Sequence, residues 1–240
     1  MVSIRPHLAR GRVARLFQRS LWIFCLTAVG LGAATFAGAQ DTNALFEKWL
    51  AVQTNLQSWT GDFTQTRSLK VLAQPLVSTG KVWVRPGEFR WELGQPPQTI
   101  VLREPSQLLI MYPMLKRVEK YSLDNPPAQL KDALSLLDAT LPRDRATMQK
   151  QFRLLAAAET NSVLQMTLQP NSVSARKFIG EIIIGFSTND FSIALTEMKF
   201  ADGSRLRNDF SHVVMNQPVD DARFELKVPA DFTVRDPLHQ

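Results

Sequence analysis

Hydrophobic and polar residues alternate over short stretches along most of the chain, and Gly, Pro, Asn or Asp bounds each stretch. Alternation with a period of two predicts a β-strand that turns one face to the core and the other to water. The predicted strands in the first half are residues 60–69, 77–85, 88–93, 98–103, 107–112 and 116–121. Those in the second half are residues 151–157, 162–168, 178–187, 192–200, 205–214 and 224–228. Short turns between neighbouring strands, such as Asp202-Gly203, indicate antiparallel pairing.

Two regions have helical spacing instead. After the capping residues Asp41-Thr42, the apolar residues Phe46, Trp49 and Leu50 recur at three- and four-residue intervals, which predicts a helix over about 43–56. A second helical pattern follows Pro126-Pro127 and consists of Leu130, Leu134, Leu137 and Leu141. Pro142 ends that pattern, and a shorter polar helix is expected up to Lys150.

This order of elements predicts a mainly β (α+β) fold. A single curved antiparallel sheet is expected, with one helix before it and a helical insertion in its middle. No internal repeat, Gly/Ser linker or low-complexity block divides the sequence, so we expect one domain.

The N-terminus has the pattern of a secretory signal peptide. Five arginines precede an apolar stretch from Leu21 to Ala34, and the small residues Ala37-Gly38-Ala39 follow it. We therefore expect residues 1–39 to be a cleaved signal peptide and the mature domain to comprise residues 40–240, located in the periplasm. One alternative is a membrane anchor, but the apolar run is shorter than the roughly 20 residues that span a bilayer. Another is a lipoprotein signal at Cys25, but large residues rather than small ones precede that cysteine.

Removing this segment changes the charge balance. The whole chain has 28 Lys+Arg and 22 Asp+Glu, a net charge of +6. Because the five arginines lie in the first 39 residues, where no acid occurs, the mature domain has a net charge of about +1 and no electrostatic signature of nucleic-acid binding. The single cysteine, Cys25, also lies in that segment, so the mature domain can form neither a disulfide nor a thiolate metal site.

Residues that could carry catalysis are sparse. His7 lies in the signal, His212 in a predicted strand and His239 near the C-terminus, and none has the spacing of a metal site or a nucleophile motif. His212 as a base is one interpretation, but an ordinary position on the sheet fits better. The pair Asp220-Asp221 stands beside turn residues, which favours capping over acid–base chemistry. We therefore expect no enzyme, no cofactor and no metal.

Large apolar residues are abundant within the predicted sheet. They are Trp59, Phe63, Trp83, Phe89, Trp91, Leu93, Leu109, Met111, Tyr112, Met114 and Leu115. In the strand 88–93, one face carries the apolar residues and the other carries Glu88, Arg90 and Glu92. The apolar face is either an ordinary core covered by a helix or an aromatic hollow for an apolar ligand.

Five stretches resemble one known family in the same order along the chain. They are 58–65 (SWTGDFTQ), 80–91 (GKVWVRPGEFRW), 95–97 (QPP), Tyr112-Pro113 with Val118, and 221–229 (DARFELKVP) with Val234. Together they resemble LolA, the family of periplasmic outer-membrane lipoprotein carriers, over nearly the whole mature domain.

The resemblance implies an incomplete barrel whose concave apolar side is covered by a helical lid. It also implies a monomeric chaperone that takes the acyl chains of lipoproteins from an inner-membrane lipoprotein-releasing ABC transporter and passes them to the outer-membrane receptor lipoprotein LolB. Two alternatives stay open: a carrier of another acylated envelope lipid or glycolipid, and a LolA-like lipid-sensing regulatory domain.

The resemblance also implies site residues. The arginine that latches the lid in the family falls on Arg85, for which the alternative is a surface ion pair beside Pro86. The residues expected to line the cavity are Phe63, Trp83, Phe89, Trp91, Leu109, Met111 and Leu115. The strand between Gly80 and Arg85 is shorter than is typical of the family, which leaves open the sheet face to which Arg85 projects.

Overall fold

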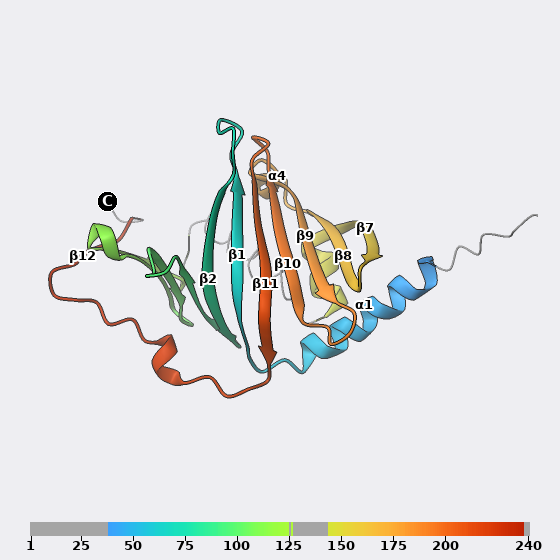
Figure 1. Ribbon diagram of the computed structural model, residues 1–240, viewed down its shortest axis with the longest axis horizontal. Helices are drawn as coiled ribbons and strands as arrows, with labels where there is room; N and C mark the ends of the chain where they lie inside the picture. The colour runs from blue at the N-terminus through green and yellow to red at the C-terminus, as the bar shows by residue number, and fades with distance from the viewer. Residues whose placement is uncertain (1–37, 125, 127–143, 238–240) are drawn as a thin grey trace, which may run out of the picture. The chain divides into compact units, whose positions relative to one another are not determined.

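The computed structural model describes residues 38–124, 126 and 144–237 (Figure 1). The predicted helical insertion from Leu130 to Leu141 and most of the predicted signal peptide lie outside the described residues. In the described part, twelve strands form a single sheet in the order β12-β6-β5-β4-β3-β2-β1-β11-β10-β9-β8-β7. The sheet is open and curved, which confirms the predicted fold class.

The strands of the first half are β1 (Trp59–Ser68), β2 (Leu76–Arg85), β3 (Glu88–Leu93), β4 (Thr99–Arg103), β5 (Gln107–Tyr112) and β6 (Arg117–Ser122). Those of the second half are β7 (Phe152–Thr160), β8 (Val163–Pro170), β9 (Ile179–Ser187), β10 (Ile193–Phe200), β11 (Arg205–Met215) and β12 (Thr233–Arg235). The helical elements are α1 (Gly38–Thr54), η1 (Pro113–Leu115), α3 (Arg145–Gln151), α4 (Val173–Arg176) and η2 (Asp221–Phe224). Strand β12 pairs parallel with β6, and every other pair of neighbours is antiparallel.

Eleven of the twelve predicted strands are confirmed, and the prediction at 224–228 is wrong. There the side chain of Asp220 accepts a hydrogen bond from the backbone N–H of Ala222, which starts the 3-10 turn η2. Phe224, at the end of η2, is buried, so its packing rather than strand pairing holds this part of the chain against the sheet. The strand that completes the sheet, β12, begins only at Thr233.

The two helix predictions that fall on described residues hold with shifted bounds. Helix α1 begins earlier than predicted, and α3 confirms the short polar helix expected before Lys150. Asp144 caps α3 by accepting a hydrogen bond of 2.7 Å from the backbone N–H of Thr147. Bonds from the Thr147 backbone and hydroxyl lower the pKa of the Asp144 carboxyl, as expected for an N-cap.

The sheet has two faces of different character, because residues opposite each other in a ladder point to the same side. We call the side packed against α1 the inner face. On it, Phe46, Trp49 and Leu50 of α1 pack against alternate residues of β8 and β9. The Trp49 side chain is fully buried and stacks on Phe186 of β9, with ring centroids 4.0 Å apart. Burial of each such large side chain contributes about 1.5–3 kcal/mol, so this packing anchors α1.

The opposite side is the outer face. Over β9, β10 and β11 it carries ion pairs, such as Lys199 with Glu181 at 2.8 Å and Arg207 with Asp209 at 2.6 Å. Over β4, β5 and β6 it is apolar and lies beneath residues 216–232, here called the C-terminal segment. Phe224 of that segment is buried in a cluster with Leu102.

Candidate functional site

An aromatic cluster lies at the middle of the inner face. Its members are Trp59 and Phe63 of β1, Trp91 of β3 and Phe210 of β11. The ring centroids of Phe63 and Trp91 are 3.9 Å apart, and Phe210 meets the Trp91 ring edge-on at 6.1 Å. Edge-to-face and offset contacts of this kind stabilise aromatic pairs beyond their buried area.

Gly80 on β2 makes the contact between β1 and β3 possible. A Cβ atom at this position would lie 2.2 Å from Cζ of Phe63 and 2.2 Å from the backbone oxygen of Glu92. Only glycine therefore lets the Phe63 ring lie across β2 and reach Trp91. The glycine in the stretch that resembles LolA thus has a steric function.

The inner face continues as an apolar surface beyond the aromatic cluster. Register places Val101 of β4 opposite Trp91 and Ile110 of β5 opposite Val101, and Phe89 and Leu93 flank Trp91 on β3. These side chains are only partly buried, whereas the inner-face residues under α1 are fully buried. These side chains of β3, β4 and β5 therefore keep part of their apolar area exposed.

Polar side chains end this surface at β5 and β6. Tyr121 donates a hydrogen bond of 3.0 Å to Glu119, and Arg117 forms an ion pair of 3.3 Å with the same carboxylate. The Arg117 guanidinium also lies over the ring of Tyr112, 4.8 Å from its centroid. Burial, followed by the bond to Glu119, raises the pKa of Tyr121 to about 12, so its hydroxyl stays a donor at neutral pH. We call Tyr112, Arg117, Glu119 and Tyr121 the polar end.

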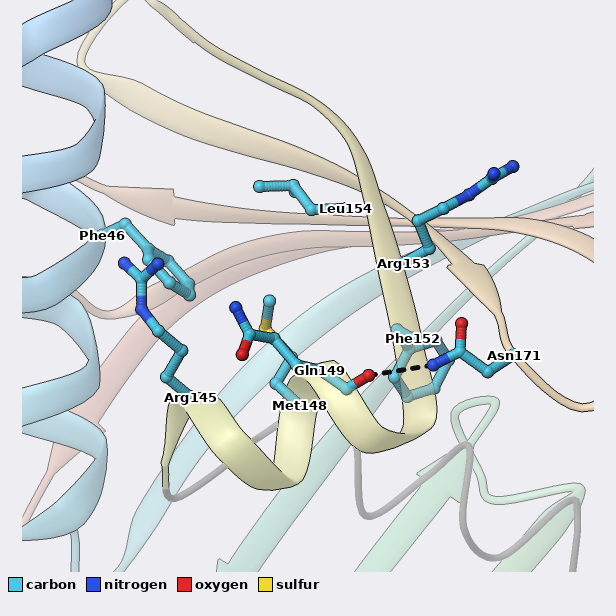
Figure 2. A pocket seen from close by; sticks show the side chains of 8 residues that line it. All are labelled: Phe46, Arg145, Met148, Gln149, Phe152, Arg153, Leu154 and Asn171. Carbon is cyan, nitrogen blue, oxygen red and sulfur yellow. Dashed lines mark hydrogen bonds between the residues drawn. The ribbon is translucent and has the colours of Figure 1, made fainter.

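A separate pocket of about 340 Å³ lies between α3 and the edge strand β7 (Figure 2). Phe46, Met148 and Phe152 form its apolar wall, and Asn171 bonds to the backbone oxygen of Gln149 at 2.9 Å. Arg145 lies over the Phe46 ring and pairs with Glu47 of α1. These contacts join α3 to α1 at one side of the pocket.

The residues considered for catalysis have other partners. His212 is 82% exposed, and its Nδ1 lies 3.1 Å from a carboxylate oxygen of Asp62. Asp220 caps η2 and Asp221 binds Arg85, which confirms the capping role predicted for one member of that pair. In the part of the chain that the structure describes, no three His, Cys, Asp or Glu side chains gather closely enough to hold a metal ion. None of the described helices has the length and apolar character to cross a bilayer.

Comparison with known proteins places this fold in a family. The family model for the outer membrane lipoprotein carrier protein LolA matches residues 54–227, which is most of the chain. The chain belongs to the LolA family. The outer-membrane lipoprotein carrier protein of Bordetella avium is 25% identical over 215 residues, 87% of this chain and 92% of that protein. The same carrier from Pseudomonas putida KT2440 is 25% identical over 221 residues, 88% of this chain and 96% of its own length.

Solved structures similar to the chain have low sequence identity. A LolA superfamily protein from Nitrosomonas europaea is 11% identical with a TM-score of 0.39, and it covers 77% of this chain and 97% of its own. The Pseudomonas aeruginosa MucA/MucB complex contains a chain that is 15% identical with a TM-score of 0.43, over 81% of this chain and 63% of its own.

The structure divides the residues that were predicted to line a cavity between the two faces of the sheet. Phe63, Phe89 and Trp91 lie on the inner face. Trp83, Leu109 and Met111 lie on the outer face, where they pack with Phe224 of the C-terminal segment. Leu115 lies in η1, and its side chain is 64% exposed.

The physical reason for this division is the alternation within each strand. Trp83 stands between Val82 and Val84, which face the aromatic cluster, so it must project to the other side. Register then aligns Trp83 with Arg90, Leu102 and Leu109 across the sheet. Four inner-face residues were not among those predicted to line the cavity: Trp59, Val101, Ile110 and Phe210. Cross-strand register is the signal that identifies them.

Arg85 also projects from the outer face. Its guanidinium pairs with Glu88 at 2.5 Å and with Asp221, and it lies over the ring of Phe224, 4.1 Å from the centroid. The hydrogen bonds that Arg85 donates to Glu88, and next the one to Asp221, raise the pKa of Arg85. These are the surface ion pairs considered as the alternative to a latch. The helical insertion that is predicted to form the lid lies outside the described residues, so the latch role stays a prediction.

Proposed function

We propose that the protein carries acylated lipoproteins through the periplasm and holds their acyl chains against the inner face. The observation that carries this proposal is the partly covered apolar surface formed by Phe89, Trp91, Val101 and Ile110 next to the aromatic cluster. Each CH₂ group removed from water contributes about 0.8 kcal/mol, so a lipidated protein in water needs such a surface. The names of the curated relatives, outer-membrane lipoprotein carriers, support the same function.

In the proposed pathway the cargo comes from the inner-membrane lipoprotein-releasing ABC transporter and goes to LolB in the outer membrane. Transfer requires that binding be reversible. An open sheet suits this, because its apolar face can be covered and uncovered without breaking a strand ladder.

The polar end supports a second candidate within the same mechanism, the carriage of another acylated envelope lipid. The Arg117 Nε atom is buried and has no hydrogen-bond partner among the described residues. A ligand with a polar group next to its acyl chains would supply an acceptor there, because an unpaired buried donor is costly. A plain hydrocarbon surface would not need this cluster.

The test is a loading assay with two matched serine variants. Phe89→Ser removes an inner-face ring and should weaken loading of a radiolabelled acylated lipoprotein about tenfold or more, since such a ring contributes about 1.5–3 kcal/mol when buried. Leu115→Ser changes an exposed residue of η1 and should load like the wild type. Urea unfolding of both variants separates a loading defect from a folding defect.

The cargo is identified by mass spectrometry of lipid that co-purifies with the protein. Lipoprotein acyl chains would support the first candidate, and a free acylated lipid would support the second. Normal loading by Phe89→Ser together with a defect in Leu115→Ser would contradict the inner-face site.

A further inference from the structure

The hairpin between β1 and β2 projects beyond its neighbour β3. Strand β2 pairs with β3 only from Gly80 onward, whereas it pairs with β1 back to Leu76. We call residues 67–78 the hairpin tip. Figure 1 shows the tip at the same end of the sheet as the β10–β11 turn and α4. Ser68 of the tip is opposite Arg205, which follows that turn.

The hairpin tip exposes large apolar side chains. Val71 is 88% exposed and Val77 is 61% exposed, and Leu72 and Leu76 are exposed as well. Phe178, which follows α4, is 63% exposed, and its backbone oxygen accepts a hydrogen bond from Ala201 in the β10–β11 turn. Single exposed apolar residues are common, but a group of them at a projecting end indicates an interaction surface.

The same end carries cations with few counter-ions. Arg67, Lys70 and Lys177 are exposed, and no ion pair to any of them is found in the described part of the chain. The sequence from Phe63 to Gly87 contains no Asp or Glu. Asp202 already accepts hydrogen bonds from the backbone N–H and hydroxyl of Ser204, at 2.8 and 2.6 Å, and these bonds lower its pKa more than the charge of Lys70 does.

We propose that this end of the sheet docks on the surface of an anionic phospholipid bilayer. Exposed aliphatic side chains can enter the boundary between headgroups and acyl chains, and flanking Lys and Arg are attracted to anionic headgroups. A protein partner is the less favoured occupant. A stable protein interface needs roughly 800 Å² of complementary surface on each side, whereas a narrow projecting hairpin needs only a soft surface to enter. The inference does not depend on the identity of the cargo.

The experiment measures co-sedimentation of the purified protein, beginning at Gln40, with lipid vesicles. Starting there removes the apolar N-terminal stretch, which could itself bind lipid. Vesicles of phosphatidylcholine with one quarter phosphatidylglycerol should bind the protein, and pure phosphatidylcholine should bind it at least tenfold more weakly. Raised salt should weaken binding to the anionic vesicles, because it screens surface charge.

Three variants localise the contact. Val71→Ser/Leu72→Ser should weaken binding at least tenfold. Lys70→Gln should weaken it about fivefold, since one basic residue near an anionic surface contributes about 1 kcal/mol. The control is Val214→Ser, which changes an exposed valine near the other end of β11 and should leave binding unchanged.

A fluorescent dye provides an independent measurement. The single cysteine of the sequence is Cys25, so the protein that begins at Gln40 has no cysteine and the dye attaches only to one that is introduced. A polarity-sensitive dye on Val71→Cys should shift to the blue on anionic vesicles, and the same dye on Val214→Cys should not. Equal binding to neutral and anionic vesicles, no binding to either, or an unchanged Val71→Ser/Leu72→Ser variant would overturn the proposal. If the wild type binds no vesicles and the Val71→Ser/Leu72→Ser variant still loses cargo transfer, the tip would be assigned to a protein partner instead.

Discussion

Arg90 fastens the C-terminal segment to the outer face, and its replacement by Met should release that segment. The guanidinium Nη1 donates to the backbone oxygens of Arg223 and Glu225, both at 3.1 Å, while Nε bonds to Glu92 at 2.6 Å. The Arg90 side chain is only 13% exposed. Met preserves most of the apolar stem but none of the donors.

The magnitude follows from the two bonds to the segment. A hydrogen bond to a charged group contributes about 1.5–3 kcal/mol. The two carbonyls lie on an exposed segment, so water replaces part of the lost interaction, and we expect a cost of about 2–4 kcal/mol in total for docking of the segment. Because about 1.4 kcal/mol corresponds to tenfold, the segment should open about 30- to 1,000-fold more often.

Amide hydrogen exchange measures this opening. Peptides that cover Asp221–Phe224 should exchange faster in Arg90→Met, while peptides from β8 and β9 should keep their rates. The double variant Arg90→Met/Glu92→Gln removes the carboxylate that the single variant leaves without its partner, and it should show the same local effect.

The control is Arg85→Met. Arg85 reaches the segment through its ion pair with Asp221, which is 86% exposed, and through the ring of Phe224, where Met preserves an apolar contact. An exposed ion pair contributes about 0–1 kcal/mol, so exchange in this variant should rise by less than about fivefold. Unchanged exchange of the segment in Arg90→Met, or an equal rise in Arg85→Met, would refute the reasoning.

Two further predictions concern the inner face. Gly80→Ala should lower the free energy of unfolding by about 1–3 kcal/mol or more, because the added Cβ would overlap Phe63 and the backbone of Glu92. Gly180→Ala, whose nearest heavy atom would be 3.7 Å away, should change urea unfolding little, and equal stability of both variants would contradict the steric argument. The folded-state pKa of Tyr121, about 12, lies above the unfolded value near 10, so the folded protein binds the hydroxyl proton more tightly. The free energy of unfolding that this difference contributes is fully present below pH 10 and should be lost as the pH rises from 10 to 12. Phenolate absorbance in Tyr112→Phe, which leaves Tyr121 as the only tyrosine, checks this, and a midpoint near pH 10 would show that the hydroxyl is not shielded.

Local chemistry in the sequence was enough to predict most of the elements. The period of two marks strands such as β8, where Leu164, Met166 and Leu168 alternate with polar residues. The Asp202-Gly203 turn needs a residue with positive φ, and Gly203 has a φ of 86°. Such signals lie within a few residues of each other, so they can be read without knowledge of the fold. The error at 224–228 arose because the C-terminal segment is held by the buried side chain of Phe224 rather than by strand pairing.

The composition of the site depends on contacts that no local pattern encodes. Alternation tells which residues of one strand share a side, but it does not tell which side meets α1. That choice follows from register across several strands and from the return of the C-terminal segment, which brings Asp221 to Arg85 across 136 residues of sequence. The sequence by itself therefore determined the strands, the abundance of aromatic residues and the family resemblance. Only the tertiary structure decided that Phe63, Phe89 and Trp91 face inward while Trp83, Leu109 and Met111 face outward, because a face is a property of the paired sheet and not of a single strand.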